Sequence, residues 1–442
     1  MSAAAGAGII LRPVQERAID AVRMSMRRVR RVLLCAPTGF GKTAAASELI
    51  RRSVSRGRRV LFIVHRREIV RDTARRLAAI GVATAVVMAD EPAPANEPVL
   101  VCSIQTLHAR KHRPPADLII WDECHHCAAR TYREIASHYP DAYHLGLTAT
   151  PERADGTGLS DMFDKLVVGA TTAELVNAGL LAPCDVVGSA TREKSLADDP
   201  LAAWQRHAAG RRTIVFATNV AHGESIRDAF VAAGIPTGFV CGATPMRERD
   251  ATLDQFARGD VLVLVNVYVL TEGFDAPATE VCLLARGCGS AATFLQMVGR
   301  VLRTAPGKTR ALLIDLCGSY VQHGLPTDER EFSLEGKPIS TKLPPLAIRQ
   351  CPECAAAFRP TAPPAMCPAC GYEFPPAEAP AVEIRSLVRA APGAGASIDQ
   401  QRAAWAAICR TGAARGYKPG WAAHQFKARF GFWPPRSFPR AA

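Results

Sequence analysis

The sequence predicts an α/β protein with two tandem parallel-sheet lobes, then a small four-cysteine module and a short basic aromatic segment. The main observation is that short runs rich in Val and Ile alternate with helical stretches, pause, and alternate again. Such alternation is typical of parallel strands covered by helices on both faces. With 442 residues, 48% of them apolar, the chain is long enough for two or three domains with proper cores.

The first lobe is expected over residues 1–183. Its strands are expected at 32–35, 60–64, 99–103, 118–121 and 145–147. Helices are expected at 43–56 and 67–80, and Gly81 suits the C-cap of the second. The strand runs are too short to be independent helices.

The second lobe is expected over residues 184–335. Its strands are expected at 213–216, 238–240, 261–266, 281–284 and 311–316. Its helices are expected at 220–233, 246–258 and 293–302, with Gly234 and Gly259 as caps. After about residue 330 the alternation stops. A cysteine module follows at 345–376, an Ala- and Pro-rich linker at 377–398, and a basic aromatic tail at 399–442.

The charge indicates a polyanionic partner. The net charge is +13, and residues 400–442 contain eight Lys or Arg and no Asp or Glu. No run of ~18 apolar residues predicts a membrane span, and the apolar start lacks the basic region of a signal peptide. We therefore expect a cytoplasmic protein whose 14 cysteines are reduced thiols or metal ligands.

A phosphate-binding loop follows the first predicted strand, at residues 36–43. Gly39 and Gly41 let backbone N–H groups approach phosphate, Lys42 reaches the β- and γ-phosphates, and Thr43 offers a hydroxyl to Mg²⁺. The strict pattern has Gly where this chain has Ala36. The strand–loop–helix context still predicts a nucleoside triphosphate site, because a chance glycine turn does not explain the Lys-Thr pair.

Acidic and basic groups elsewhere complete a hydrolytic site. Asp122 and Glu123 follow the strand at 118–121, where Asp122 could hold the metal and Glu123 could deprotonate the attacking water. Arg300 and Arg303 lie three apart on a predicted helix, so we expect them to share a face and stabilise transition-state charge from across a cleft.

These motifs resemble the superfamily-two DExH-box helicases and translocases, and seven of them occur in family order over residues 11–303. The resemblance implies two RecA-like lobes with ATP and Mg²⁺ in the cleft and a nucleic-acid strand across both. The implied nucleotide-binding residues are Gln15, which reads adenine, Thr38, Gly39, Gly41, Lys42, Thr43, Asp122, Gly273 and Asp275. The implied coupling residues are His125, Thr148, Thr150 and Gln296, with His125 bridging to Gln296. The implied strand contacts are Arg66, Gln105, Thr106 and Thr271.

Within the superfamily the chain is most similar to RadD-type bacterial repair ATPases and related phage DExH helicases. The features are the segments 148–153 and 272–277, the cysteine module and the aromatic tail. Two departures stand out. Cys124 replaces the usual Ala, which carries no direct chemistry, and the span 183–211 is short beside those relatives, which puts coupling and strand separation in doubt.

Two Cys-x-x-Cys pairs, at 351–354 and 367–370, have the spacing of a structural Zn²⁺ site. The four expected ligands are Cys351, Cys354, Cys367 and Cys370. The segment 124–127, Cys-His-His-Cys, is rejected as a metal site because its ligands would crowd and Glu123 and His125 have better-defined roles. In the tail, cations could bind phosphates and aromatic rings could stack on bases, with Lys418, Trp421 and Lys427 as candidates; the alternative is a mini-core with solvated cations.

The sequence thus predicts an ATP-dependent DNA helicase or translocase in repair or recombination, acting as a monomer on single-stranded or branched DNA. Repair or single-strand-binding proteins are its expected protein partners. Three alternatives stay open: an RNA helicase, a zinc-containing binding protein with a degenerate motor, and the motor subunit of a restriction system.

Overall fold

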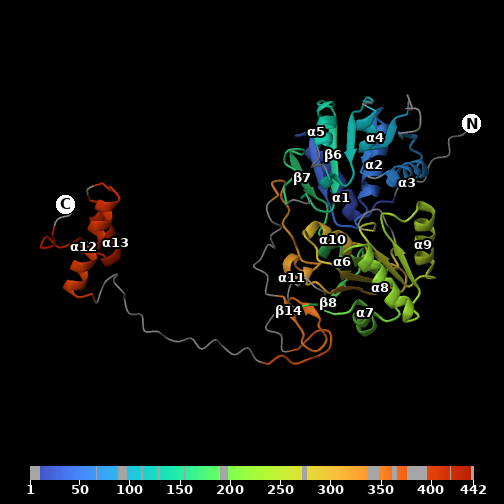
Figure 1. Cartoon of the computed structure of the whole chain (residues 1–442). Coiled ribbons are helices and arrows are strands. Elements are labelled where there is room, and N and C mark those ends of the chain that lie inside the picture. The colour runs from blue at the N-terminus through green and yellow to red at the C-terminus, as the bar shows by residue number, and fades with distance from the viewer. Residues whose placement is uncertain are drawn as a thin grey trace, which may run out of the picture. The chain divides into compact units, whose positions relative to one another are not determined.

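The computed structural model describes residues 10–65, 67–87, 97–110, 113–126, 130–153, 156–189, 198–270, 276–336, 348–360, 366–375, 396–418 and 420–439. The chain divides into two compact units, the first ending at Phe374 and the second beginning at Pro375. The first unit contains two parallel sheets and the cysteine module, and the second contains a pair of helices (Figure 1). No helix in the described ranges is long and apolar enough to cross a membrane.

The first lobe is built on a seven-stranded sheet whose pairings are all parallel, in the order β3-β4-β2-β5-β6-β1-β7. The strands are β1 (Arg31–Cys35), β2 (Val60–Val64), β3 (Thr84–Val87), β4 (Val99–Ser103), β5 (Leu118–Trp121), β6 (Tyr143–Thr148) and β7 (Lys165–Val168). Five of these match the expected strands, while β3 and β7 at the two edges were not predicted. Because the strands are parallel, the loops after β1, β5 and β6 lie at one edge of the sheet.

Helices cover both faces of this sheet. They are α1 (Pro13–Met26), α2 (Lys42–Val54), α3 (Arg67–Ala79), α4 (Ile104–Ala109) and α5 (Arg130–Ser137), and α6 (Thr172–Asn177) follows β7 in the connection to the second lobe. Successive strand residues face opposite sides: Leu34 packs in one core with Ile19 of α1, and Leu33 packs in the other with Ile135 of α5. The prediction of a doubly covered parallel sheet is confirmed.

Buried His144 on β6 makes the first lobe sensitive to acid. Its ring stacks on Trp121, its Nδ1 accepts a hydrogen bond from Trp121 Nε1 at 3.2 Å, and its Nε2 lies 3.1 Å from the Tyr139 carbonyl. Burial lowers the pKa of His144 to about 4 from an ordinary 6.5. The neutral ring is therefore the form that the fold requires.

Lowering the pH from 6.5 to 4 should reduce the unfolding free energy of the wild type by about 3 kcal/mol, because the unfolded chain binds the proton first. The His144 contribution is fully present above pH 6.5 and is lost as the pH falls through 4. In His144→Gln this fraction of the pH dependence should disappear, as measured by unfolding midpoints across that range. Parallel pH profiles for the two proteins would contradict the assignment.

The second lobe is built on a six-stranded parallel sheet in the order β10-β11-β9-β12-β13-β8. The strands are β8 (Cys184–Gly188), β9 (Thr213–Ala217), β10 (Thr237–Val240), β11 (Val263–Asn266), β12 (Val281–Ala285) and β13 (Ala311–Asp315). The helices are α7 (Pro200–Ala208), α8 (Val220–Ala232), α9 (Met246–Arg258), α10 (Ala291–Gly299) and α11 (Ser319–His323). The edge strand β8 lies in the junction, where no strand was predicted.

Beyond α11 the chain returns to the first lobe, and we call residues 325–336 the return segment. Leu334 is buried in the first lobe's core. Its carbonyl accepts hydrogen bonds from Leu159 N at 2.7 Å and Ser160 N at 3.0 Å. A side chain at Gly158 would overlap the Leu334 carbonyl, so this contact requires glycine there. The return segment is therefore a second connection between the lobes, besides residues 171–183.

The cysteine module docks on the second lobe. Its strands β14 (Arg349–Gln350) and β15 (Ala357–Phe358) form an antiparallel pair, and Ala356 bridges to Val187 of β8. Arg359 also binds Asp328 of the return segment through two hydrogen bonds of 2.8 and 2.6 Å. The module thus covers the β8 edge of the second sheet and holds the return segment.

The second unit consists of α12 (Ile398–Ala414) and α13 (Trp421–Phe430). Ser397 caps α12 with its side chain, so the helix begins at Ile398, the last residue of the expected linker. Apolar side chains from both helices and from the segment after them form a separate core of Trp405, Ala422, Phe426, Phe430 and Phe438. Part of the tail's aromatic content therefore has a packing role, as one of the two interpretations of the tail predicted.

Candidate functional site

The phosphate-binding loop lies between β1 and α2, where the sequence predicted it. Gly39 and Gly41 have φ values of 90° and 87°, a left-handed conformation that favours glycine. The loop leads into the N-terminus of α2, which begins at Lys42, so unpaired backbone N–H groups face the place where phosphate would bind. Lys42 Nζ donates to the Ala36 carbonyl at 2.9 Å, which holds the ammonium over the loop. Thr43 follows on the same turn.

Gln15 of α1 is tied to this loop. Its side chain is buried, and its Nε2 donates to the Phe40 carbonyl at 2.8 Å and lies 3.4 Å from the Gly41 carbonyl. Its Oε1 accepts from the backbone N–H of Arg12 at 2.8 Å. The carboxamide that the resemblance assigns to adenine therefore also fixes the back of the phosphate loop.

The acidic pair lies after β5, at the same sheet edge as the phosphate loop. The backbone N–H of Asp122 donates to the Ile63 carbonyl at 2.9 Å, which continues the sheet by one residue. Glu123 has φ of +46°, a left-handed conformation that is costly for a side chain of this size. Backbone strain of this kind is concentrated at functional sites, where the surrounding structure maintains it. Here it turns the carboxylate toward His125, whose Nδ1 lies 3.3 Å from Glu123 Oε2.

His125 links the two lobes. Its Nε2 lies 3.2 Å from Gln296 Nε2 of α10, and both side chains are more than nine-tenths buried. With the Gln296 amide donating, the neutral imidazole accepts at Nε2 and carries its proton on Nδ1. That Nδ1 faces Glu123 and also lies 3.2 Å from Thr148 Oγ1.

Thr148 extends this network to Thr150. The Thr148 hydroxyl donates to the Thr150 carbonyl at 2.6 Å, and the Thr150 N–H donates back to it at 3.2 Å. All four residues to which the resemblance assigns coupling therefore lie in one hydrogen-bonded chain. This chain passes within 3.3 Å of Glu123 Oε2, at His125 Nδ1, and crosses into the second lobe.

The two arginines differ from the prediction. The helix α10 ends at Gly299, so Arg300 is its C-cap and Arg303 lies beyond it, in an extended bridge with Leu181. They do not share a helical face, because Arg300 still has helical dihedrals and Arg303 already lies in the extended bridge. Arg300 is buried, and the Arg303 stem lies beside Gly39 of the phosphate loop. Burial, and secondly the cation of Arg76, lower the pKa of Arg303.

The second lobe contacts the phosphate loop directly at Gly299. A Cβ atom added at Gly299 would lie 2.7 Å from the Thr38 Cβ, closer than real side-chain contacts. A pocket between the lobes is formed by residues of this loop, of α10 and of the return segment, including Thr38, Leu295, Gly299, Asp328, Arg330 and Phe332. The return segment therefore borders the same cleft.

Sequence reasoning missed Lys308, for which no motif gives a signal. Its Nζ donates to three backbone carbonyls, those of Thr279 at 2.5 Å, Val301 at 2.6 Å and Pro277 at 3.0 Å. Burial lowers the pKa of Lys308 to about 8. Because Val301 lies between the two arginines, this ammonium fixes the turn that places them.

The residues expected to contact the nucleic-acid strand differ in exposure. Gln105 is exposed on α4, but Thr106 is buried, and its hydroxyl lies 2.9 Å from the Ser103 hydroxyl that caps this helix. Thr106 therefore supports the helix N-terminus through its buried hydroxyl. Arg66, Thr271, Gly273 and Asp275 lie outside the described residues. In the second unit Lys418 and Lys427 are exposed, whereas Trp421 is half-buried against Tyr417 and Gly412.

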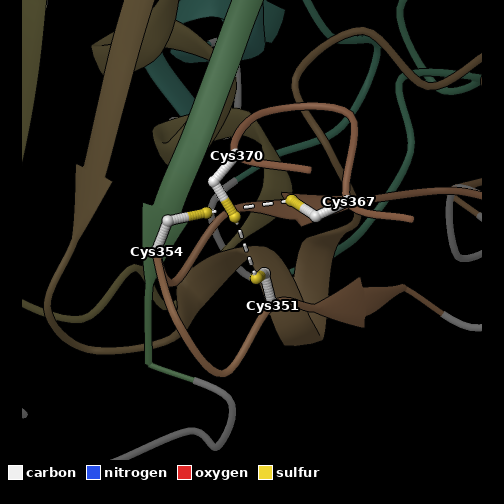
Figure 2. Close-up of side chains that lie close together, drawn as sticks. All are labelled: Cys351, Cys354, Cys367 and Cys370. Atoms are coloured by element: carbon white, nitrogen blue, oxygen red, sulfur yellow. Dashed lines mark hydrogen bonds between the residues drawn. The ribbon is translucent and has the colours of Figure 1, made fainter. Parts of the chain in front are cut away.

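The four cysteines of the module converge on one point (Figure 2). All four Sγ atoms lie within 4.8 Å of one another, with Cys351 to Cys370 at 3.6 Å and Cys354 to Cys367 at 3.8 Å. A tetrahedral Zn²⁺ with Zn–S bonds of about 2.3 Å requires thiolates about 3.8 Å apart. The donor set therefore fits Zn²⁺, and with four protein ligands it fits a structural site. The residues after each knuckle, Ala355 and Gly371, both have positive φ.

Purified protein should contain about one Zn²⁺ per chain, and Cys367→Ser should lose it, because three thiolates leave the site open. Metal analysis of the purified proteins measures this. Cys409→Ser, at a cysteine outside the cluster, is the matched control and should keep its zinc. The variant that loses zinc should also be cleaved by protease within residues 348–375, since a segment this small has little core of its own. Equal zinc content in both variants would exclude the site.

The phosphate loop of one lobe, contacted by Gly299 and the stem of Arg303 of another, defines the class of two-lobed motors driven by a nucleoside triphosphate. Residues 8–153 match the family described as type III restriction enzyme, res subunit, and residues 197–305 match the helicase conserved C-terminal domain. A 51.5 kDa protein of a Lactococcus phage is 30% identical over 74% of this chain and 75% of its own length. The chain belongs to the superfamily-two helicases and is an ATP-hydrolysing enzyme of that family.

Other relatives are longer. IRC3 of Saccharomyces cerevisiae, assigned as an ATP-dependent helicase, is 30% identical over 70% of this chain but only 52% of its own length. Rad25 of Halobacterium salinarum, assigned as a DNA 3'-5' helicase, is 28% identical over 69% of this chain and 54% of its own. Among solved structures, an HsdR-subunit fragment of a type I restriction enzyme from Vibrio vulnificus has a TM-score of 0.59 at 24% identity, covering 74% of this chain and 67% of that one. This last similarity concerns the fold.

Proposed function

We propose that this motor moves along DNA and serves DNA repair or recombination, as a cytoplasmic monomer of the RadD type. The observation that carries a working motor, as opposed to a degenerate one, is the buried hydrogen-bonded chain from Thr148 through His125 to Gln296, with Glu123 Oε2 3.3 Å from His125 Nδ1. It joins the hydrolytic edge of one lobe to the helix of the other that precedes the arginines. A chain of this kind transmits a change at the nucleotide to the angle between lobes.

DNA is supported over RNA by the names of the relatives. Rad25 is assigned as a DNA helicase, and the first family model is described from a restriction enzyme. Single-stranded or branched DNA is the proposed track, because superfamily-two lobes hold one strand mainly by its phosphates. The repair assignment depends on the likeness to RadD-type ATPases and on the cysteine module and tail that accompany it. We propose repair or single-strand-binding proteins as its partners.

The test is steady-state ATP hydrolysis by the full chain with single-stranded, duplex and forked DNA and with RNA. Stimulation by DNA, and not by RNA, is expected, and it should vanish in Lys42→Ala. A motor stimulated only by RNA would overturn the DNA track and leave the motor intact. Protein that binds DNA but never hydrolyses ATP would show a degenerate core.

A restriction motor is the second candidate. It is favoured by the HsdR-like fold and by the match to the res-subunit family. It would require a nuclease on another subunit, because the sequence shows no nuclease carboxylate-lysine cluster. Co-purification with a nuclease subunit would decide for this candidate, and a motor that is active in the absence of any partner would favour the repair assignment.

A further inference from the structure

The second unit has more aromatic side chains than its core uses. The core is complete with Trp405, Phe426, Phe430 and Phe438, and Trp405 Nε1 donates to the Pro439 carbonyl at 2.7 Å, which closes the end of the unit. Trp433 lies outside this core and is 49% exposed. A large exposed ring next to a finished core calls for an explanation other than packing.

Trp433 rests on one side of α13. Lys427 Nζ lies 4.4 Å from the Trp433 ring centroid, and the His424 ring meets it edge-on with centroids 5.0 Å apart. His424 and Lys427 are three residues apart, so they lie on the same side of the helix. One face of the indole is thereby supported, and its half exposure leaves a flat surface open to solvent. A supported ring of this kind can stack on a planar ligand without losing much conformational freedom.

The charge around this ring has one sign. The described residues of the unit include seven Lys or Arg, all exposed, and one acidic residue, Asp399. The cations are Arg402, Arg410, Arg415, Lys418, Lys427, Arg429 and Arg436. Asp399 is paired with Arg402 at 3.5 Å, so the described part of the unit offers no carboxylate for the other six. Three of these six, Lys427, Arg429 and Arg436, lie within seven residues of Trp433 in the chain.

We propose that residues 396–439 form a second nucleic-acid site, separate from the motor, which binds single-stranded DNA. Trp433 stacks on a base with its open face, and Lys427, Arg429 and Arg436 bind the flanking phosphates. Cations and a free aromatic face are the two elements that single-strand-binding surfaces combine. An acidic peptide would use the charges but would give the flat ring no comparable partner, and anionic vesicles are included in the test because a membrane interface could take both the ring and the charges. This site deepens the proposed function, since it places the same polymer on a second surface.

Trp421 takes a different role from the one the sequence suggested. Its ring packs on Tyr417, with centroids 4.5 Å apart, and against Gly412 of α12. It therefore stabilises the contact between the two helices. Trp433, further along the chain, is the side chain that the geometry selects for stacking.

The test is binding of a labelled oligothymidylate to the full chain at several salt concentrations. Trp433→Ala should weaken binding about tenfold, since stacking on a base contributes about 1–3 kcal/mol, and should leave the salt slope unchanged. Trp433→Phe should retain most of the affinity because it keeps a ring. Lys427→Ala combined with Arg429→Ala should instead lower the salt slope by about 1.4, or about 0.7 for each lost phosphate contact.

Matched controls separate this site from the motor and from misfolding. Val231→Ala, at an exposed residue of α8 in the second lobe, should bind like the wild type. ATP turnover at saturating DNA should be unchanged in Trp433→Ala, because the residue lies outside the motor. If ATP turnover is never stimulated but Trp433→Ala still weakens binding, the proposed function fails and this site stands. Unchanged DNA affinity and an unchanged salt slope in both tail variants would overturn the site. It would also be overturned if the variants lost binding to an acidic peptide or to anionic vesicles but not to the oligothymidylate.

Discussion

Glu123→Gln should slow ATP hydrolysis by at least about 100-fold while the protein still binds ATP and DNA. Glu123 is the carboxylate at the hydrolytic edge with a strained backbone, and we assign to it removal of a proton from the attacking water. Loss of a positioned general base costs about 100- to 10,000-fold in rate. The amide keeps the size of the side chain, and the hydrogen bonds of His125 to Thr148 and Gln296 do not involve residue 123, so the network to Gln296 should survive.

Steady-state turnover and equilibrium binding of a fluorescent ATP analogue measure the two effects separately. Lys42→Ala should lose turnover together with phosphate binding, because it removes the cation that the loop holds in place. Glu134→Gln, at an exposed glutamate of α5 in the same lobe, is the matched control and should be active. A Glu123→Gln protein that hydrolyses ATP at the wild-type rate would remove Glu123 from the catalytic role.

A single methyl group at Gly299 should reduce ATP turnover by about 100-fold. In Gly299→Ala the new Cβ would meet the Thr38 Cβ at 2.7 Å, so α10 or the phosphate loop must move by about 1 Å. Displacements of about 1 Å at a reacting centre cost about 100-fold in rate. The loss should lie in hydrolysis and in DNA stimulation and not in ATP binding itself, because the phosphate loop belongs wholly to the first lobe.

Gly287→Ala provides the control for this prediction. Gly287 also lies in the second lobe, before α10, and a Cβ there meets no atom within 4 Å. Its turnover should match that of the wild type. If Gly299→Ala were as active as Gly287→Ala, the direct packing of α10 on the phosphate loop would not be needed for hydrolysis.

The catalytic motifs were predictable because each lies where a parallel strand ends. β1, β5 and β6 contain Val, Ile or Leu runs that fix their positions, and the loops after them must share one edge. Arg303 was not predictable in the same way. The apolar residues Val301 and Leu302 continue the helical pattern, but both are buried in the second lobe after the helix has ended. Tertiary packing, together with the hydrogen bonds of Lys308 to three backbone carbonyls, overrides the local helix propensity here.

Several packing contacts of individual side chains could not be predicted from the sequence. Leu334 looks like an isolated apolar residue in a polar stretch, and only the structure shows it in the first lobe's core. The family resemblance assigned Thr106 to a nucleic-acid contact, and the structure shows its hydroxyl buried beside the hydroxyl of the capping residue Ser103. In the tail, composition indicated that some aromatics must pack, but the choice between Trp421 and Trp433 depends on which ring the helices enclose.

The return segment has a mechanical consequence. Within the described residues the lobes are connected through residues 171–183 and again through residues 325–336, and the second connection is anchored by Leu334. Two bodies connected at two separate points rotate most easily about the line through both points, which acts as a hinge axis. Sliding and wide separation are restrained. Each nucleotide cycle would then trace the same arc, so the length of a step would be fixed by the chain's own geometry.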